Sequence, residues 1–194
     1  MHICKVFKKY SPLFLIIVLL LWGCNPKPEY LYKVVKIKDG DTIGLLSSDN
    51  QQMTVRLAEV DCPEKTQAFG QVAKKFTSDL CFGKYVKLVG NVHDRYGRTV
   101  ALVILEDGTN VNYQLVKSGY AWQYKQYSQS AQLAGYEQQA RQNRLGLWAD
   151  ANPTPPWEYR REKKAGTLAT QPDSLQQKPK KHYRKRKPKL EEAY

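Results

Sequence analysis

Polar and hydrophobic residues alternate in two separate stretches of the chain, and this period of two predicts β-strands. Turn sequences rich in Asp, Gly, Ser and Asn separate the strands. Three strands are expected in the first stretch and two in the second, over 30–37, 42–46, 51–57, 85–92 and 98–105. The first three strands are predicted to form an antiparallel meander, because only tight turns connect them.

Between the third and fourth strands the hydrophobic period changes to that of a helix. Apolar side chains recur at helical spacing over 67–81, with Gly83 directly after the element. Two further helices are expected over 111–118 and 128–144, the second with Ser128 as its N-cap. A helix between the third and fourth of five strands is the order of an OB-fold. We therefore expect an α+β domain, a five-stranded Greek-key β-barrel with three helices.

The domain is expected over residues 30–150, and the segment that follows it differs from it in composition. Residues 151–194 contain 12 Lys and Arg residues and five acidic residues, in a chain whose net charge is +13. Prolines open this segment, apolar residues are few, and it ends in runs of lysine and arginine, so we interpret it as a basic disordered tail. Its charge favours a polyanionic partner, either nucleic acid or an anionic membrane surface.

The first 24 residues are typical of an export signal. Three lysines precede an apolar run over 12–22, which is short for a bilayer-spanning helix and leads into Gly23-Cys24. This ending resembles the lipobox of bacterial lipoproteins, in which the cysteine is lipidated. The alternatives are an uncleaved helical anchor and an ordinary secretory signal. All three predict export; the lipoprotein interpretation adds a membrane anchor at Cys24 on the periplasmic or cell-surface side, with 25–29 as a tether.

Cysteine and histidine usage limits the chemistry of the predicted domain. It contains Cys62 and Cys81, which export would allow to form a disulfide, although two buried free thiols are the interpretation we favour. The sequence has no C-x-x-C motif and no histidine cluster, so a zinc site is not expected. His93 is the single histidine of the domain, which leaves little basis for histidine catalysis.

Charged residues cluster around the end of the third predicted strand. Arg56 lies within the strand, Asp61 and Glu64 follow it, and Pro63 stops regular strand pairing there. A rigid strand can hold such residues at a surface for binding or catalysis. Taken alone, Arg56 and Glu64 fit a surface ion pair better than a catalytic site. Other motifs of the chain change this balance.

Two turns supply those motifs, Asp39-Gly40-Asp41-Thr42 upstream and Asp94-Arg95-Tyr96-Gly97-Arg98 downstream. Together with the central segment they contain every group that phosphodiester hydrolysis needs: a cation site, a group to position water, and donors for the developing charge. Carboxylates suit the hard ion Ca²⁺, and the planar fork of arginine suits phosphate.

These motifs resemble, in order and approximate spacing, the micrococcal (staphylococcal) nuclease family, also called the thermonuclease family. The resemblance extends over about residues 30–150 and includes Val55-Arg56-Leu57, Val60-Asp61-Cys62-Pro63-Glu64 and a closing Leu145-Gly146-Leu147-Trp148. It implies an OB barrel with three helices and a Ca²⁺-dependent nuclease. Such an enzyme would act on DNA and RNA with low sequence specificity, and we expect a monomer.

The resemblance also implies roles for the carboxylates. Asp41 and Asp61 correspond to Ca²⁺ ligands, and Cys62 corresponds to a residue that provides a main-chain carbonyl ligand. Glu64 corresponds to the carboxylate that activates or orients the attacking water. The segment between Glu64 and the first helix is shorter than in the type enzyme of the family.

The basic residues receive roles in the same way. Arg56 and Arg98 correspond to the two guanidinium groups on the scissile phosphate, and Arg95 and Tyr96 to residues near a substrate phosphate. The stretch 121–127 matches the family loosely, so no base-stacking tyrosine is assigned there.

Two other functions stay open at this point. An OB-fold module that binds nucleic acid without cleaving it would lack one of the catalytic groups, whereas this chain retains all of them. A surface lipoprotein could instead act through its basic tail, with the barrel as a spacer. Deleting residues 151–194 would separate that function from catalysis.

Overall fold

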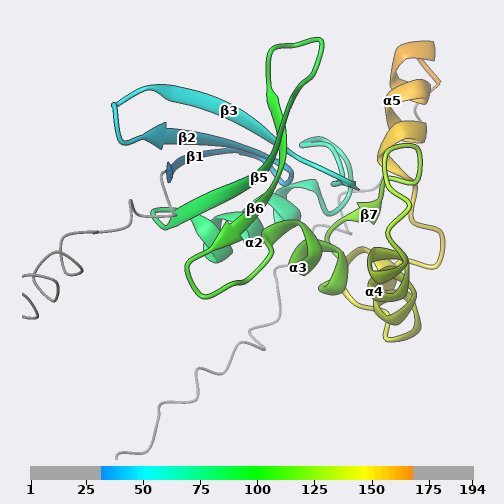
Figure 1. Cartoon of the computed structure of the whole chain (residues 1–194). Helices are drawn as coiled ribbons and strands as arrows, with labels where there is room; N and C mark the ends of the chain where they lie inside the picture. Colours follow the sequence, from blue (N-terminus) through cyan, green and yellow to red (C-terminus); the bar gives the residue numbers. More distant parts are fainter. Residues whose placement is uncertain (1–31, 168–194) are drawn as a thin grey trace, which may run out of the picture.

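Five strands close into one barrel, in the order β1-β2-β3-β6-β5 (Figure 1). The structure, a computed structural model, describes residues 32–167. The strands are β1 (Tyr32–Asp39), β2 (Thr42–Ser47), β3 (Gln52–Leu57), β5 (Tyr85–His93) and β6 (Thr99–Leu105). All neighbours pair antiparallel except β3 and β6, which are parallel and set Arg56 beside Val100. The predicted α+β class and five-stranded barrel are confirmed.

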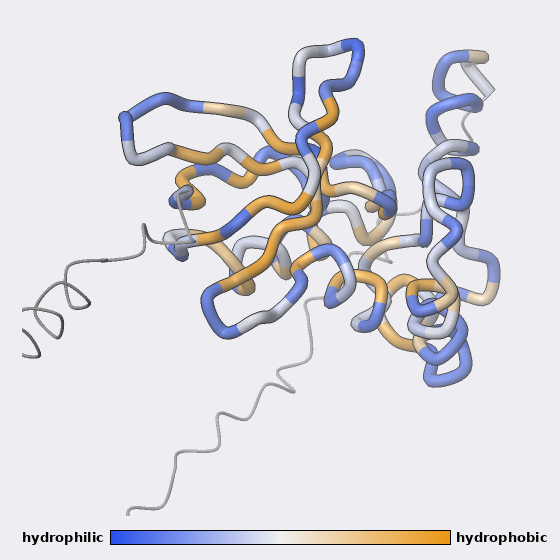
Figure 2. Tube along the Cα trace, viewed as in Figure 1, coloured by the Kyte–Doolittle hydropathy of each residue, from blue (hydrophilic) through white to orange (hydrophobic). Residues whose placement is uncertain are grey.

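Alternating side chains fill the barrel, as the period of two predicts. Along β6 every second residue is buried, from Thr99 to Leu105. Within residues 32–167, Figure 2 shows hydrophobic residues along the strands and hydrophilic residues at the turns between them. Strands and helices pack around one common core, to which the strands contribute Val34, Ile43, Leu45, Val55, Leu57, Val86 and Val103.

The three predicted helices are present: α2 (Gly70–Cys81), α3 (Val111–Lys117) and α4 (Ala131–Gln142). The N-cap of α4 differs from the prediction. Ser130 caps the helix by accepting a hydrogen bond from the N–H of Leu133, whereas Ser128 is buried and its hydroxyl accepts from the N–H of Ser130. Both serines have the chemistry of a cap, and only the turn before the helix decides which one takes that place.

A fourth helix, α5 (Pro156–Ala165), lies where we expected a disordered tail, so that prediction is wrong for these ten residues. Pro156 occupies the first turn, where a missing N–H costs nothing, and Gly166 ends the helix in the left-handed conformation. Glu158 near the start and lysines near the end complement the helix dipole. Residues 168–194 with the lysine and arginine runs, and residues 1–31 with the export signal, Cys24 and the tether, lie outside the described residues.

A second cluster of buried side chains joins α4, α5 and the end of the predicted domain. It consists of Trp122, Ala140, Leu147 and Trp148, with Phe69 and Trp157 packed against it. Leu147 and Trp148 belong to η1 (Gly146–Ala149), a 3₁₀ turn formed by the closing motif, and the N–H of Leu147 donates to the carbonyl oxygen of Gly119 at 2.8 Å. A Cβ atom on Gly146 would lie 2.2 Å from that same oxygen, so glycine is required for this close approach.

Two short strands that the sequence did not predict lie outside the barrel. β4 (Val60–Asp61) pairs antiparallel with β7 (Trp122–Gln123), which places Asp61 opposite Trp122. Two residues carry too little periodicity to be recognised as a strand. This pairing connects the end of the barrel to the tryptophan cluster, and it fixes the main chain at Asp61.

Cys62 and Cys81 are both buried free thiols, the interpretation that we favoured over a disulfide. Burial raises the pKa of Cys81 to about 12, and its Sγ donates to the carbonyl oxygen of Thr77. Burial likewise raises the pKa of Cys62 well above its ordinary value. Both side chains therefore stay neutral thiols within the core.

Candidate active site

Arg56 connects two carboxylates at the end of β3. Its Nη2 donates to Oδ1 of Asp61 at 2.8 Å and lies 3.3 Å from Oδ2 of Asp41. Its Nη1 donates to the main-chain carbonyls of Leu57 and Val60, each at 2.8 Å. Only 14% of the Arg56 side chain is exposed. The guanidinium is therefore oriented by the barrel itself, and it brings Asp41 and Asp61 to one place.

Strand pairing explains why Asp41 reaches this arginine. Thr42, the first residue of β2, is in register with Arg56 of β3, so the residue before it lies beside the guanidinium. Asp41 is held on both sides, because its carbonyl accepts from the N–H of Leu57 and its Oδ2 accepts from the N–H of Cys62 at 2.7 Å. The predicted metal ligands Asp41, Asp61 and Cys62 are therefore neighbours in space.

Burial, together with neighbouring negative charge, raises the pKa of two carboxyl groups in this region. Burial, and then the negative charges of Asp41 and Glu64, raise the pKa of Asp39. Burial also raises the pKa of Asp61 above its ordinary value, against the hydrogen bond of Arg160 and the positive charge of Arg56. Burial and nearby negative charge both disfavour the ionised form of these carboxyl groups, and a bound cation would favour it.

Glu64 does not pair with Arg56; its ion pair is with Arg160 of α5. Nη1 of Arg160 donates to Oε1 of Glu64 at 2.8 Å, and Nη2 donates to Oδ2 of Asp61 at 2.8 Å. Burial lowers the pKa of Arg160, but its hydrogen bonds to the two carboxylates outweigh burial and hold the pKa above its ordinary value. Arg160 could not be recognised from the sequence analysis, because residues 156–165 were assigned to a disordered tail.

The loop that carries Glu64 is closed tightly on α2. The N–H of Gln67 donates to the carbonyl of Glu64, and the side-chain oxygen of Gln67 accepts from the N–H of Glu64. A Cβ atom on Gly70 would lie 1.9 Å from the carbonyl oxygen of Glu64, so a side chain at that position cannot be accommodated. The glutamate therefore extends from a fixed main chain.

The other predicted site residues lie together on the hairpin between β5 and β6. Asp94 organises the turn: its Oδ1 accepts from the N–H groups of Tyr96 and Arg98, and its Oδ2 accepts from Nε of Arg98 at 2.7 Å. The guanidinium groups of Arg95 and Arg98 lie over the Tyr96 ring, 4.9 and 5.4 Å from its centroid. Tyr96 itself is well exposed. The hairpin thus presents two arginines and one aromatic ring to solvent.

A cleft of about 620 Å³ connects this hairpin to the start of β2. Its lining includes Asp39 and Thr42, the neighbours of Asp41, together with Tyr96 and Arg98. Arg98 therefore faces the same cleft as the turn that carries Asp41. Within residues 32–167, however, Arg98 makes its ion pair with Asp94 and not with the carboxylates around Arg56.

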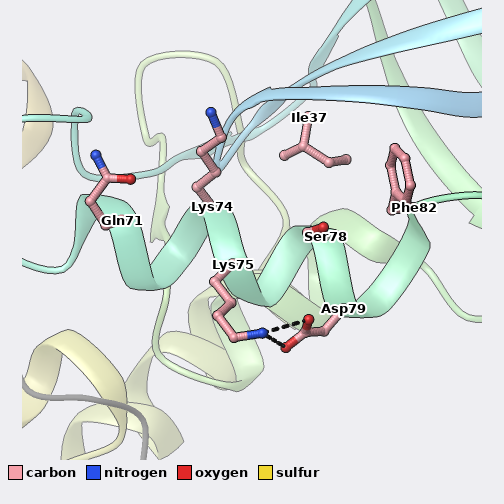
Figure 3. Close-up of a pocket in the computed structure, with 7 residues that line it drawn as sticks. All are labelled: Ile37, Gln71, Lys74, Lys75, Ser78, Asp79 and Phe82. Atoms are coloured by element: carbon pink, nitrogen blue, oxygen red, sulfur yellow. Dashed lines mark hydrogen bonds and ion pairs between the residues drawn. The ribbon is translucent and has the colours of Figure 1, made fainter.

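A second hollow of about 510 Å³ lies between α2 and β1 (Figure 3). Figure 3 shows Lys75 and Asp79 joined along α2, with Ile37 and Phe82 on the opposite side. None of the predicted site residues lines it, and its one carboxylate is already paired with a lysine. The hollow is therefore separate from the site around Arg56.

The donor set around Arg56 fits a calcium ion in its chemistry. Asp41 and Asp61 provide hard carboxylate oxygens that converge on one nitrogen of Arg56, and Ca²⁺ prefers such ligands. In the part of the chain that the structure describes, no group of three or more His, Cys, Asp or Glu side chains is arranged to hold a metal ion. Two carboxylates would thus have to be completed by main-chain carbonyl oxygens or water.

Comparison with known proteins identifies the class of this protein. The staphylococcal nuclease homologue family matches residues 54–150, which include Arg56, Asp61, Glu64 and Arg98. The chain belongs to the staphylococcal nuclease family. This confirms the family expected from the motifs, and with it the expected enzyme class, that of the phosphodiester hydrolases.

Individual relatives extend the similarity over most of the chain. This protein is 45% identical over 150 residues to an uncharacterized endonuclease of Haemophilus influenzae, and the match covers 77% of this chain and 83% of the relative. It is 39% identical over 160 residues to a micrococcal nuclease of Shigella flexneri, covering 77% of this chain and 91% of the relative. An uncharacterized endonuclease of Escherichia coli O157:H7 is 38% identical over 156 residues, 80% of this chain and 99% of its own length.

The helices of residues 32–167 are all too short or too polar to cross a membrane.

Proposed function

We propose that this chain is a Ca²⁺-dependent nuclease that hydrolyses the phosphodiester bonds of DNA and RNA as a monomer. The observation that carries the proposal is the geometry around Arg56. A largely buried guanidinium joins Asp41 and Asp61, and Glu64 follows three residues later on a tightly held loop. A merely structural ion pair would need neither the second carboxylate nor the fixed glutamate.

Asp41 and Asp61, with the main-chain carbonyl of Cys62, would hold the Ca²⁺ ion. When bound, the ion supplies positive charge that offsets the charge of the phosphate and so allows a nucleophile to approach. The convergence of the Asp41 and Asp61 carboxylates on one nitrogen of Arg56 supports a cation in this place.

Glu64 activates or orients the attacking water in this proposal. Its side chain is 37% exposed, so water has access to it, while the loop around Gln67 fixes its main chain. General acid–base catalysis of this kind typically contributes ~10²–10⁴-fold to the rate. Arg56 and Arg98 stabilise the charge that develops on the phosphate, and loss of one such donor typically costs ~10²–10³-fold.

Arg95 and Tyr96 contact a neighbouring phosphate of the substrate. The hairpin presents them beside Arg98 and next to the cleft, which supports this role. Because phosphate contacts carry no sequence information and DNA and RNA share the phosphate, we expect activity on both with low sequence specificity.

The enzyme is proposed to be exported and anchored to a membrane through lipid on Cys24, on the periplasmic or cell-surface side. The Gly23-Cys24 ending of a short apolar run supports this. Once its signal segment has been cleaved, a Cys24→Ala protein should no longer be attached to the membrane. A Cys24→Ala protein that stays in the membrane with an uncleaved N-terminus would replace the lipid with a helical anchor.

Glu64→Gln tests the catalytic proposal most directly. Glutamine keeps the size of the side chain but cannot take a proton from water, so kcat should fall by ~10²–10⁴ while substrate affinity holds or improves. Single-turnover cleavage of a short labelled DNA and of an RNA, in saturating Ca²⁺ and in EGTA, measures this. Circular dichroism checks folding.

Glu106→Gln is the matched control, because Glu106 is an exposed glutamate in the turn after β6. It should cleave like wild type. A folded Glu64→Gln protein that cleaves within a few-fold of Glu106→Gln would refute the role of Glu64. Equal cleavage in EGTA and in Ca²⁺ would refute the metal dependence.

A further inference from the structure

Arg160 takes the carboxylate oxygens that the proposed metal site needs. Its Nη2 donates to Oδ2 of Asp61 at 2.8 Å, and its Nη1 donates to Oδ1 of Asp61 at 3.3 Å and to Oε1 of Glu64 at 2.8 Å. Arg56 also binds Oδ1 of Asp61. Both oxygens of Asp61 are therefore engaged by guanidinium groups.

We propose that Arg160 is an intramolecular competitor of the metal ion, so that α5 sets how tightly the site binds Ca²⁺. The inference rests on the proposed Ca²⁺ site at Asp41 and Asp61. A guanidinium and a divalent cation both offset the negative charge of the same oxygens. Binding of one must therefore weaken binding of the other, because the two compete for Asp61.

The charges around the site make such a competitor effective. The carboxylates of Asp41, Asp61 and Glu64 share two guanidinium groups, and Arg56 offsets only a part of their charge. Arg160 supplies the next positive charge. In the absence of a metal ion it stabilises the ionised carboxylates, and a metal ion has to displace it from them.

The helix that carries Arg160 is held by contacts that do not involve this arginine. The hydroxyl of Tyr159 is 2.9 Å from Oγ1 of Thr66, and the ring of Trp157 is stacked on Tyr124 with an interplanar angle of 2°. Nε2 of Gln67 donates to the carbonyl oxygen of Thr154, just before the helix. The guanidinium can therefore leave Asp61 by changing side-chain rotamer while α5 stays docked beside the site.

The exposure of Arg160 agrees with a displaceable group. Its side chain is 41% exposed, and within residues 32–167 its hydrogen bonds go to Asp61 and Glu64 alone. Glu64 is also accessible and can exchange the guanidinium for water at small cost, whereas the buried Asp61 keeps Arg56 as a partner. The competition would therefore reduce the Ca²⁺ affinity without abolishing Ca²⁺ binding.

Calorimetric titration of Ca²⁺ into the purified, EGTA-stripped chain tests this without reference to activity. Wild type is compared with Arg160→Gln and with Arg161→Gln. Arg161 is the next residue of α5, is exposed, and makes no side-chain hydrogen bond or ion pair within residues 32–167, so it controls for the loss of one charge. We expect Arg160→Gln to bind Ca²⁺ about tenfold tighter than wild type, within the 5- to 150-fold range typical of coupled ligands.

The outcomes separate this inference from the proposed function. Tighter binding by Arg160→Gln, with Arg161→Gln close to wild type, supports the competition. Equal or weaker binding by a folded Arg160→Gln protein overturns it and leaves the Ca²⁺ site intact. An equal gain in both variants also overturns it, since the effect would then be one of general charge. If folded wild type and Arg160→Gln both fail to bind Ca²⁺, the proposed Ca²⁺ site itself is wrong.

Thermal unfolding followed by circular dichroism and by tryptophan fluorescence shows whether each variant keeps α5 docked, because Trp157 contacts Trp122 and Tyr124. Arg160→Lys provides a second variant. It keeps the charge but loses the planar fork, and its Ca²⁺ affinity should lie between those of wild type and Arg160→Gln. Affinity in Arg160→Lys above that of Arg160→Gln would count against the competition.

Discussion

Two arginines bind Asp61, and they are held in different ways. Arg56 belongs to β3, has a 14% exposed side chain and also donates to two main-chain carbonyls. Arg160 belongs to α5, has a 41% exposed side chain and donates to carboxylates alone. The first is therefore part of the barrel, whereas the second reaches the site from a helix that packs outside it (Figure 1).

This difference teaches that contact with the same carboxylate does not give two residues the same role. Removing Arg56 would take a guanidinium donor away from two carboxylates and two carbonyl oxygens in a largely buried place. Removing Arg160 would expose Asp61 and Glu64 to water, which can replace the guanidinium. The same chemical change should thus have unequal consequences for stability.

The largest effect is expected from Arg56→Ala. Breaking a buried ion pair from one side typically costs about 3–5 kcal/mol, and we expect a loss of unfolding free energy in that range. Urea denaturation followed by circular dichroism at neutral pH measures it. A loss below about 1 kcal/mol would show that Arg56 is not part of the barrel's structure.

Deletion of residues 168–194, which keeps α5, should weaken binding of nucleic acid and leave the chemical step unchanged. The slope of log affinity against log salt concentration should flatten by about 0.7–0.9 for each phosphate that the shortened chain no longer binds. Binding is measured in EGTA over a series of salt concentrations. The basic tail would have no part in binding if the truncated chain bound equally well at every salt concentration.

Arg160→Ala should change the unfolding free energy by about 0–1 kcal/mol, the usual contribution of a solvent-accessible ion pair. The same urea assay applies, so the two arginines can be compared directly. A loss as large as that of Arg56→Ala would contradict the distinction between them, and it would make α5 an integral part of the fold.

The smallest effect is expected from Asp94→Asn in the hairpin. Burial raises the pKa of Asp94 less than hydrogen bonds from Arg98 and Tyr96 lower it, so its pKa lies below the ordinary value of 3.8. A carboxyl group whose pKa is lowered by folding stabilises the folded state at pH values above its ordinary pKa. This stabilisation is lost as the pH falls through the pKa of the folded state. Wild type should therefore lose slightly more stability than Asp94→Asn as the pH falls from neutrality through that pKa. Parallel pH dependences in urea denaturation would contradict this.

Much of the site could be predicted from the sequence because it is local. Arg56, Asp61 and Glu64 lie within nine positions on one strand and the loop after it, so strand alternation and a proline sufficed to place them together. Arg95, Tyr96 and Arg98 likewise share one turn, in which Asp94 binds its own neighbours. Motif resemblance then supplied the roles that are proposed for these positions.

The partner of Glu64 could not be predicted in this way. Arg160 lies 96 positions from Glu64, and it arrives there through the packing of Trp157 and Tyr159, which no local pattern specifies. The pairing of β4 with β7 is similar, because strands of two residues have no period of their own.

By itself the sequence determined the barrel, the three helices of the predicted domain and the grouping of the site residues along the chain, since periodicity and turn chemistry act over a few residues. Only the tertiary structure decided that Arg56 forms ion pairs with Asp41 and Asp61, and that Arg160 forms ion pairs with Asp61 and Glu64. It also decided that residues 156–165 form a helix. Ion-pair partners and helix docking depend on contacts between distant segments, and those contacts exist only once the barrel and the tryptophan cluster have formed.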